Sequence, residues 1–356
     1  MAYTTIDNPE LYFQTKLYTG TGSELAITLD GDEDMQPDFV WINSRSDSQH
    51  KRVYDAVRGA NKVMYPNLTA GEYTVTEELK SFNSDGFTLG TEGALNTGSN
   101  LYLAWCWKAG TTSGITTTGA DITPSSYSFN QTAGISIVTY TGNSSTDQQI
   151  AHGLNNVPHF IICKVRDADN AQNWDTYHHK NTAAPETDYL SLNLNNATAD
   201  AVARWQDTAP TSVLFTVGDA GAVNQTGDGI MAYLFTSIQG YSRFGVYTGN
   251  NSDPNGPFVY LGFSPAWVMI KRSDSSDNWK IHTKKVEVFN PINQSFSADT
   301  NSGENTETDH EIDFLSNGFK LKENNSAFNA SGGSYIFAAF AEAPFVNSEG
   351  VPCNAR

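Results

Sequence analysis

The sequence has few cysteines, no long apolar run and no basic leader. Its three cysteines, Cys106, Cys163 and Cys353, are an odd number at wide spacing, which fits neither a disulfide framework nor a zinc site. The N-terminus lacks a basic region followed by an apolar stretch, so no signal peptide is readable. No segment reaches the roughly eighteen apolar residues that a membrane-spanning helix needs. We therefore expect free thiols, synthesis in a host cytoplasm and no membrane insertion.

Positive charge is also scarce. The chain has 21 Lys and Arg residues against 39 Asp and Glu residues, and its formal net charge at pH 7 is −18. Such a surface repels phosphate backbones and anionic membranes at long range. The charge balance therefore excludes nucleic acid as an expected partner, and the ordinary role of such acidity is solubility at high copy number.

The residues that are abundant favour β-structure. Short runs rich in Val, Ile, Phe, Tyr and Trp are bounded by Gly, Pro, Asn and Asp, as strands and their turns are. Helical patterns are scarce. Because 356 residues exceed what one hydrophobic core usually organises, two or three domains are expected.

The main feature of the sequence is a threefold internal repeat. The triplet Tyr-Thr-Gly occurs in each copy and is followed, at nearly constant distance, by a proline and an apolar run. An arginine then opens a polar loop, an aromatic residue follows, and a second apolar run closes the copy. The triplets begin at Tyr18, Tyr140 and Tyr247, and the closing runs are 102–107, 230–235 and 335–340. Ordered matches of this kind indicate triplication of one unit.

Each copy is predicted to be a two-sheet β-sandwich, of the jelly-roll or lectin-like kind, so the fold class is all-β with three tandem sandwich domains. The closing runs are almost wholly apolar, which predicts strands covered on both faces. The Gly/Thr/Ser/Asn-rich stretch between copies one and two is predicted to be a linker. The expected segments are an N-terminal arm (1–13), sandwiches (14–107, 135–237 and 244–345), linkers (108–134 and 238–243) and a C-terminal tail (346–356).

Stretches in all three copies resemble a known family. They include Asp38-Phe39-Val40-Trp41-Ile42, Asp55-Ala56-Val57-Arg58-Gly59, Ala104-Trp105-Cys106-Trp107-Lys108, and residues 134–142 and 335–345. They are similar to a repeat domain of unknown function that is common in bacteriophage structural proteins, particularly those of marine and cyanobacterial phages. The resemblance implies a place on the virion, usually in a tail fibre, tail tip or other appendage. Copy two lacks the Asp-x-Val-Arg-Gly element, so any role of Asp55 and Arg58 is not shared by all copies.

Catalytic and metal-binding patterns are weak. Carboxylates are abundant, but nothing specifies the pair that a glycosidase needs, and no Gly-x-Ser-x-Gly turn marks a nucleophile. Asp30, Asp32 and Asp34 alternate like the first ligands of a calcium loop, but Met35 stands where the loop needs Gly and no Glu occupies the twelfth place. We predict no enzyme and no cofactor, with these three carboxylates as a weak calcium candidate.

Aromatic residues give two open interpretations. Trp174, Tyr177 and Trp279 are candidates for contact with a carbohydrate receptor, because an aromatic face suits the apolar face of a sugar ring. Recurrence of tryptophan at one repeat position favours core packing instead.

The expected function is that of a virion structural protein in a tail fibre or tail appendage. It would contact other virion proteins, form a homo-oligomer with a trimer favoured, and aid host attachment by weak contacts that multiply with copy number. One alternative is an adhesin that binds or cleaves host surface polysaccharide. Another is a protein that decorates the capsid head.

Overall fold

Strands make up nearly all of the regular structure in the computed structural model, which describes residues 2–353. The all-β prediction is therefore confirmed. The helices are single turns: α1 (Gly93–Asn96), α2 (Val202–Trp205), α3 (Gly221–Asn224), α4 (Ser326–Asn329), and 3-10 turns at Pro9–Leu11, Pro185–Thr187 and Thr308–His310. None of the helices in this part of the chain is long and apolar enough to cross a membrane.

Repeat 1 contains a four-stranded main sheet and a three-stranded small sheet, both antiparallel. The main sheet has the order β1 (Phe13–Thr19), β9 (Leu101–Trp107), β3 (Phe39–Ser44) and β4 (Arg52–Asp55). The small sheet has the order β2 (Leu25–Thr28), β8 (Gly86–Leu89) and β7 (Leu79–Asn83). A short pair, β5 (Lys62–Val63) and β6 (Tyr73–Thr74), lies in the long loop after β4.

Repeat 2 has the same plan with additions at both ends of its main sheet. The order is β10 (Ser126–Asn130), β11 (Ile135–Thr141), β18 (Gly229–Phe235), β13 (Phe160–Val165), β14 (Asp175–His178), β15 (Asp188–Ser191) and β16 (Ala199–Asp200). The small sheet is β12 (Gln148–Ala151) with β17 (Leu214–Val217).

The stretch 108–134, expected to be a linker, belongs to repeat 2 instead. Its strand β10 pairs with β11, and its Ile122 bridges to Ile150 of β12. It therefore covers the open side of this sandwich, where the edges of the two sheets would otherwise face solvent. The alternation in Ser126-Tyr127-Ser128-Phe129-Asn130 is a strand pattern that the Gly/Thr/Ser-rich flanks obscured.

Repeat 3 completes the set. Its main sheet has the order β19 (Ser242–Thr248), β26 (Ser334–Pro344), β21 (Phe263–Arg272), β22 (Lys280–Thr283) and β23 (Phe296–Ser297), and its small sheet has the order β20 (Phe258–Tyr260), β25 (Gly318–Leu321) and β24 (Ile312–Leu315). In the main sheets β1 pairs with β9, β11 with β18 and β19 with β26. In the small sheets β2 pairs with β8, β12 with β17 and β20 with β25, so the chain of each repeat wraps as in a jelly roll. The sandwich prediction is confirmed.

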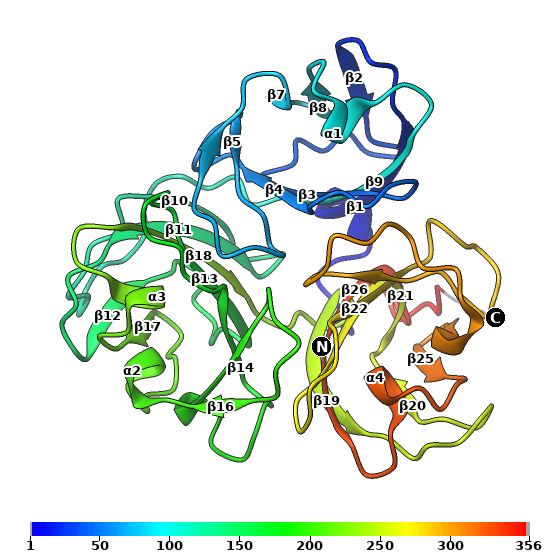
Figure 1. Cartoon of the computed structure of the whole chain (residues 1–356). Coiled ribbons are helices and arrows are strands. Elements are labelled where there is room, and N and C mark those ends of the chain that lie inside the picture. The colour runs from blue at the N-terminus through cyan, green and yellow to red at the C-terminus, as the bar shows by residue number, and fades with distance from the viewer. Residues whose placement is uncertain (1, 354–356) are drawn as a thin grey trace.

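The three sandwiches surround a common centre (Figure 1). Each main sheet packs one face against its own small sheet, giving three local cores, and turns the other face inward to one shared cluster. The closing strands β9, β18 and β26 lie in the middle of the main sheets, so both their faces are buried, as their apolar sequences predicted. The three repeats are thus joined into one body rather than strung as separate domains.

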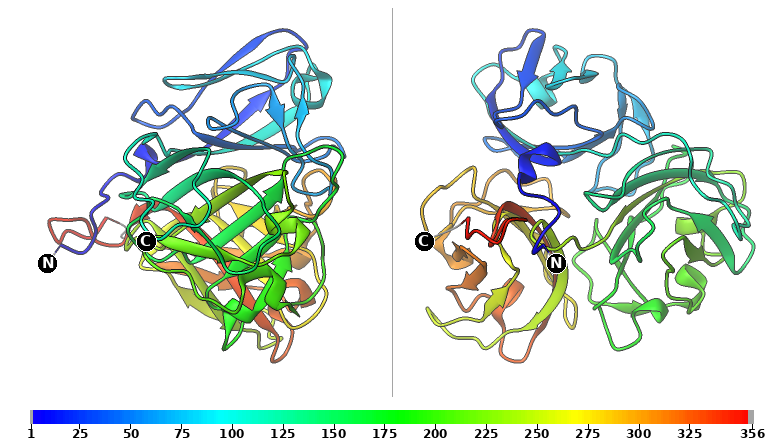
Figure 2. Two further views of the ribbon diagram at one scale, coloured as in Figure 1. Left: turned by 90° about the vertical axis from the view of Figure 1, so that its left-hand side faces the viewer. Right: turned by 180° about the vertical axis from the view of Figure 1, so that it is seen from behind.

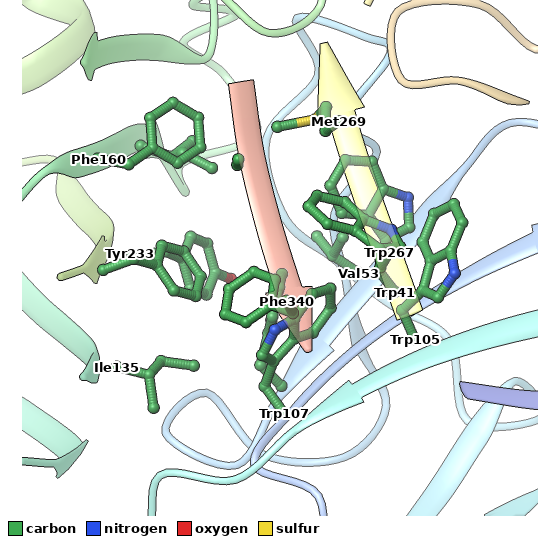
Figure 3. Close-up of a cluster of buried hydrophobic side chains, with 14 of the residues drawn as sticks. Trp41, Val53, Trp105, Trp107, Ile135, Phe160, Tyr233, Trp267, Met269 and Phe340 are labelled. Atoms are coloured by element: carbon green, nitrogen blue, oxygen red, sulfur yellow. The ribbon is translucent and has the colours of Figure 1, made fainter. Parts of the chain in front are cut away.

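An aromatic pair repeats at the inner face of each main sheet. The cross-strand partners are Phe39 and Trp107, Phe160 and Phe235, and Trp267 and Phe340. Their ring centroids are 5.2, 6.4 and 5.7 Å apart respectively. Figure 3 shows one or both members of each pair (Trp107, Phe160, Trp267 and Phe340) gathered with Trp105 and Tyr233 in the shared cluster. Aromatic side chains bury more area than other residues, so this cluster is the main apolar contribution to holding the repeats together.

The Tyr-Thr-Gly triplet and a buried asparagine form a clamp in each repeat. The tyrosine hydroxyl donates to a carbonyl of the single-turn helix, and a Cβ on the glycine would lie 2.1 to 2.3 Å from a backbone carbonyl oxygen, so only glycine fits. The helix ends on Asn96, Asn224 or Asn329, each fully buried. Each amide accepts from the backbone just after the triplet and donates to two carbonyls. The triplet therefore recurs because it closes the sandwich.

The two ends of the described chain meet at one end of the body. In Figure 2 the N-terminal segment and the C-terminal tail project side by side. The Asp7 carboxylate accepts hydrogen bonds from the Ser348 backbone N–H at 2.7 Å and from the Ser348 hydroxyl at 2.5 Å. Both segments thus lie against each other beside repeat 3.

Candidate functional site

The aromatic residues proposed for receptor contact lie inside the protein. Trp174, Tyr177 and Trp279 are 1%, 3% and 1% exposed. Trp174 and Trp279 belong to the central cluster, whereas Tyr177 belongs to the local core of repeat 2. None of these rings offers a face to a sugar, so the receptor-contact interpretation is corrected in favour of core packing.

The two tryptophans also tie neighbouring repeats together. The Trp174 indole N–H donates to the Tyr65 and Leu68 carbonyls of repeat 1, each at 3.0 Å, and the Trp279 indole N–H donates to the Ser191 carbonyl of repeat 2 at 3.1 Å. The same position in repeat 1 is Lys51, whose ammonium donates to the Ser302 carbonyl of repeat 3. Each repeat therefore donates to a neighbour, and the three contacts close a ring.

The Asp-x-Val-Arg-Gly element, residues 55–59, also forms a contact between repeats. Arg58 pairs with Asp55, and both side chains are fully buried. The Tyr233 hydroxyl of repeat 2 donates to the same carboxylate at 2.7 Å. Burial alone would lower the pKa of Arg58, but the carboxylate beside it raises that pKa well above its ordinary value. The two residues thus form a buried ion pair at the boundary between repeats 1 and 2.

The calcium candidates Asp30, Asp32 and Asp34 are exposed and do not converge. The Asp30 carboxylate pairs with Lys16 and, at 3.5 Å, with Lys285. Within residues 2–353, no group of three His, Cys, Asp or Glu side chains is placed to hold a metal ion. Met35, which occupies the place of the loop glycine, is instead buried in the local core of repeat 1. The loop is therefore shaped by this apolar anchor.

A surface groove on repeat 3 is the best candidate for a binding site. Its volume is about 750 Å³, and it lies where the edge strands β19 and β20 face solvent, beside residues 179–180 of repeat 2. Phe258, Tyr260 and Val246 line it and are 48%, 46% and 47% exposed. In repeat 2 the corresponding side is covered by 108–134, so the groove exists because repeat 3 has no such cover.

The two aromatic residues Phe258 and Tyr260 of the groove are specific to repeat 3. Phe258 and Tyr260 flank the residue that pairs with Phe319, the phenylalanine of the repeated Gly-Phe or Leu-Phe motif. The equivalent flanking residues are Ala26 and Thr28 in repeat 1, and Gln149 and Ala151 in repeat 2. The fold therefore does not require aromatic residues at these places.

The charged residues of the groove are all cationic. Lys180 and Arg243 line it, and the described residues around it include no Asp or Glu. His179 also lines the groove, but burial lowers the pKa of this imidazole and so favours its neutral form. The six other arginines within residues 2–353 each pair with a carboxylate, whereas Arg243 has no such partner in the same span. The equivalents of Arg243, counted from the Tyr-Thr-Gly triplet, are the neutral residues Gln14 and Ser136. An unpaired guanidinium is thus exposed on a chain of net charge −18.

The position of Tyr260 is supported from two sides. The Arg243 guanidinium carbon lies 5.7 Å from the centre of the Tyr260 ring, within reach of a cation–π contact. The Tyr3 hydroxyl lies 3.3 Å from the Tyr260 hydroxyl and donates to the Gly262 carbonyl at 2.9 Å. Burial and this neighbouring hydroxyl raise the pKa of Tyr3 to about 12, so the Tyr3 phenol is a neutral hydrogen-bonding group at pH 7.

The repeated motifs did not predict this groove, because its two aromatic residues lie on an edge strand outside those motifs. The usable signal was the departure from the repeat: Phe-Val-Tyr at 258–260 stands where the other copies have small or amide side chains.

A family model described as a domain of unknown function (DUF7483) matches residues 8–344, and so spans all three repeats. No curated protein and no solved structure matches the chain. What the groove binds therefore has to be inferred from the residues of this chain.

Proposed function

The chain belongs to this family of unknown function, and we propose that it is a non-enzymatic structural protein of a bacteriophage particle. It stands in a tail fibre or another external appendage, contacts other virion proteins, and is present in several copies. Its groove on repeat 3 makes weak contacts with the host surface, and these contacts multiply when several copies engage one cell.

The observation that supports this proposal is the contrast between the packed centre that joins the repeats and the exposed groove on repeat 3. The inner aromatic residues, the buried ion pair and the indole donors are engaged in joining the repeats. Within residues 2–353, it is in this groove that exposed aromatic rings lie beside a guanidinium without a carboxylate partner. The likeness of the repeat sequences to phage structural proteins supplies the virion context.

Binding without cleavage is the chemistry that the groove favours. Hydrolysis of a glycoside by the common mechanisms uses two carboxyl groups at a defined separation. The described lining of the groove supplies aromatic, hydroxyl and cationic groups instead. These groups can hold a ligand, and none of them is a pair of carboxyl groups for acid and base catalysis.

The position of the protein on the particle tests the proposal. Antibodies raised against the purified chain are applied to particles of the phage that encodes it and located by electron microscopy. Label on the tail or an appendage is expected. Label on the head would replace the tail assignment by capsid decoration, and unlabelled particles would overturn the virion assignment.

A second assay tests the absence of catalysis. The purified protein is incubated with host surface polysaccharide, and new reducing ends are measured over time. No release above a heat-denatured control is expected. Steady release that depends on protein concentration would make the chain a carbohydrate-cleaving adhesin.

A further inference from the structure

We propose that the groove on repeat 3 binds an acidic polysaccharide, with one uronate residue stacked on Tyr260 and its carboxylate held by Arg243. This assignment rests on the proposed attachment function and names the ligand of the same site. The groove is defined here by Arg243, Val246, Phe258, Tyr260 and Lys180.

The aromatic part of the groove suits a sugar ring. Phe258 and Tyr260 are two residues apart on β20, so their side chains point to the same face of the strand while Val259 points into the core. Two neighbouring rings on one edge strand form a platform long enough for consecutive sugars. The apolar face of a pyranose packs on such rings, which leaves its hydroxyl groups free to bond with water or with the Tyr3 and Tyr260 hydroxyls.

The cationic part of the groove selects an acidic ligand. A guanidinium binds a carboxylate through two parallel hydrogen bonds, and such bonds are roughly twice as strong as neutral ones. Arg243 is exposed and has no carboxylate partner among the described residues, so it is available to a ligand. Lys180, on the repeat 2 side of the groove, is exposed and likewise lacks a carboxylate partner within residues 2–353, so it adds a second positive charge.

The charge of the whole chain strengthens this selection. With a net charge of −18, the protein repels acidic polymers over most of its surface, and only a place where positive charge is exposed can hold one. An acidic ligand would therefore engage the chain at this groove in preference to the rest of the surface. A neutral glycan could accept hydrogen bonds from Arg243 and Lys180, but it would lack the attraction between opposite charges.

The test uses the full chain and short synthetic ligands. Binding of a galacturonate oligomer is measured by titration calorimetry at about 0.01 M and about 1 M salt. A galactose oligomer and a glutamate oligomer of the same length are measured in parallel. We expect the galacturonate oligomer to bind best and its binding to weaken at high salt.

Variants locate the binding. Arg243→Gln should weaken galacturonate binding about 10- to 100-fold, which corresponds to one charge-assisted pair of hydrogen bonds. Tyr260→Ala should weaken it about tenfold through the lost ring contact. Lys108→Gln removes the same charge outside the groove and should leave binding unchanged. Because Phe258 is half exposed, Phe258→Ser is a second platform variant if Tyr260→Ala does not fold, as judged by circular dichroism.

Three results would overturn the inference. They are no binding of the galacturonate oligomer to the folded chain, equal binding of the galactose oligomer, or binding that Arg243→Gln and the platform variants leave unchanged. Binding of the glutamate oligomer as tightly as the saccharide would make the groove a peptide site. The antibody labelling of particles does not depend on any of these results, so failure of the ligand assignment and failure of the virion assignment are distinguishable.

Discussion

The inner faces of the three main sheets are alike, whereas the open side of repeat 3 differs from the same place in the other two repeats. Inside, a cross-strand aromatic pair recurs in every copy, and an indole or ammonium group at one repeat position donates to a neighbouring repeat. Outside, Phe258 and Tyr260 stand where the other repeats have small or amide residues.

This difference distinguishes residues that build the common fold from residues that serve a single repeat. Residues that recur in all copies build the common body, because each sandwich has to bury the same inner face. A residue that departs from the repeat and is exposed has no part in that packing. Departure together with exposure therefore indicates recognition. Substitutions in the centre should affect stability, and substitutions in the groove should affect binding.

The largest effect is expected in the shared centre. Trp107 contacts Phe13 of its own repeat and Phe235, Trp267 and Phe340 of the others, with ring centroids 4.9 to 6.5 Å apart. Trp107→Ala should lower the free energy of unfolding by about 3–5 kcal/mol, since it leaves a large cavity. Tyr260→Ala should change it by about 0.5 kcal/mol or less, as exposed residues do. Denaturant titration measures both, and equal losses would remove the distinction between centre and groove.

The asparagine clamp comes next. Asn329→Ala leaves two carbonyls and one N–H without their buried partner, which should cost about 1–3 kcal/mol of unfolding free energy. Asn324→Ala, at an exposed place in the same loop, is the control and should be nearly neutral. A clamp variant as stable as its control would mean that the repeated asparagine does not close the sandwich.

Acid should lower the free energy of unfolding, because buried histidines in the folded protein resist protonation. Burial lowers the pKa of His152 and His159 to about 4 and that of His178 and His282 to about 3. The unfolded chain, with histidines near 6.5, then binds more protons than the folded chain, so stability falls as pH drops from about 6.5 toward 3.

Buried carboxyl groups oppose this trend, because burial raises the pKa of Asp38, Asp175 and Asp299. Burial raises the pKa of Asp38 and Asp299 to about 6, so these groups add stability as pH falls from about 6 toward 4. Burial lowers the pKa of all seven histidines, so the histidines outnumber these carboxyl groups and the net effect is a loss. Thermal unfolding between pH 8 and pH 4 measures it, and His178→Gln should flatten the slope. A midpoint that rises steadily toward pH 4 would contradict the assignment.

The smallest effect concerns a single hydrogen-bond donor. Trp174→Phe removes the indole N–H that bonds to repeat 1, whereas Trp205→Phe removes an indole N–H that has no partner among the described residues. The first change should cost about 1 kcal/mol more than the second. Equal costs, measured by denaturant unfolding, would show that the bond between repeats adds nothing beyond ring packing.

The sequence was sufficient for the strands and for the triplication, since the Tyr-Thr-Gly triplets and the closing runs are local patterns. It did not show that the inner faces meet, because apolar residues on both faces of β9 predict burial without naming the partner. The groove was missed for a related reason. Phe258 and Tyr260 are exposed because repeat 3 lacks a strand equivalent to β10, which covers the same side of repeat 2.

Scanning calorimetry of the whole chain tests most directly whether the three repeats form one body. Because the repeats share the cluster around Trp107 and Phe340, no repeat can unfold without exposing the inner faces of the others. A single transition is therefore expected, with calorimetric and van't Hoff enthalpies equal. Three separable transitions, or a calorimetric enthalpy about three times the van't Hoff value, would show that the repeats unfold as independent domains.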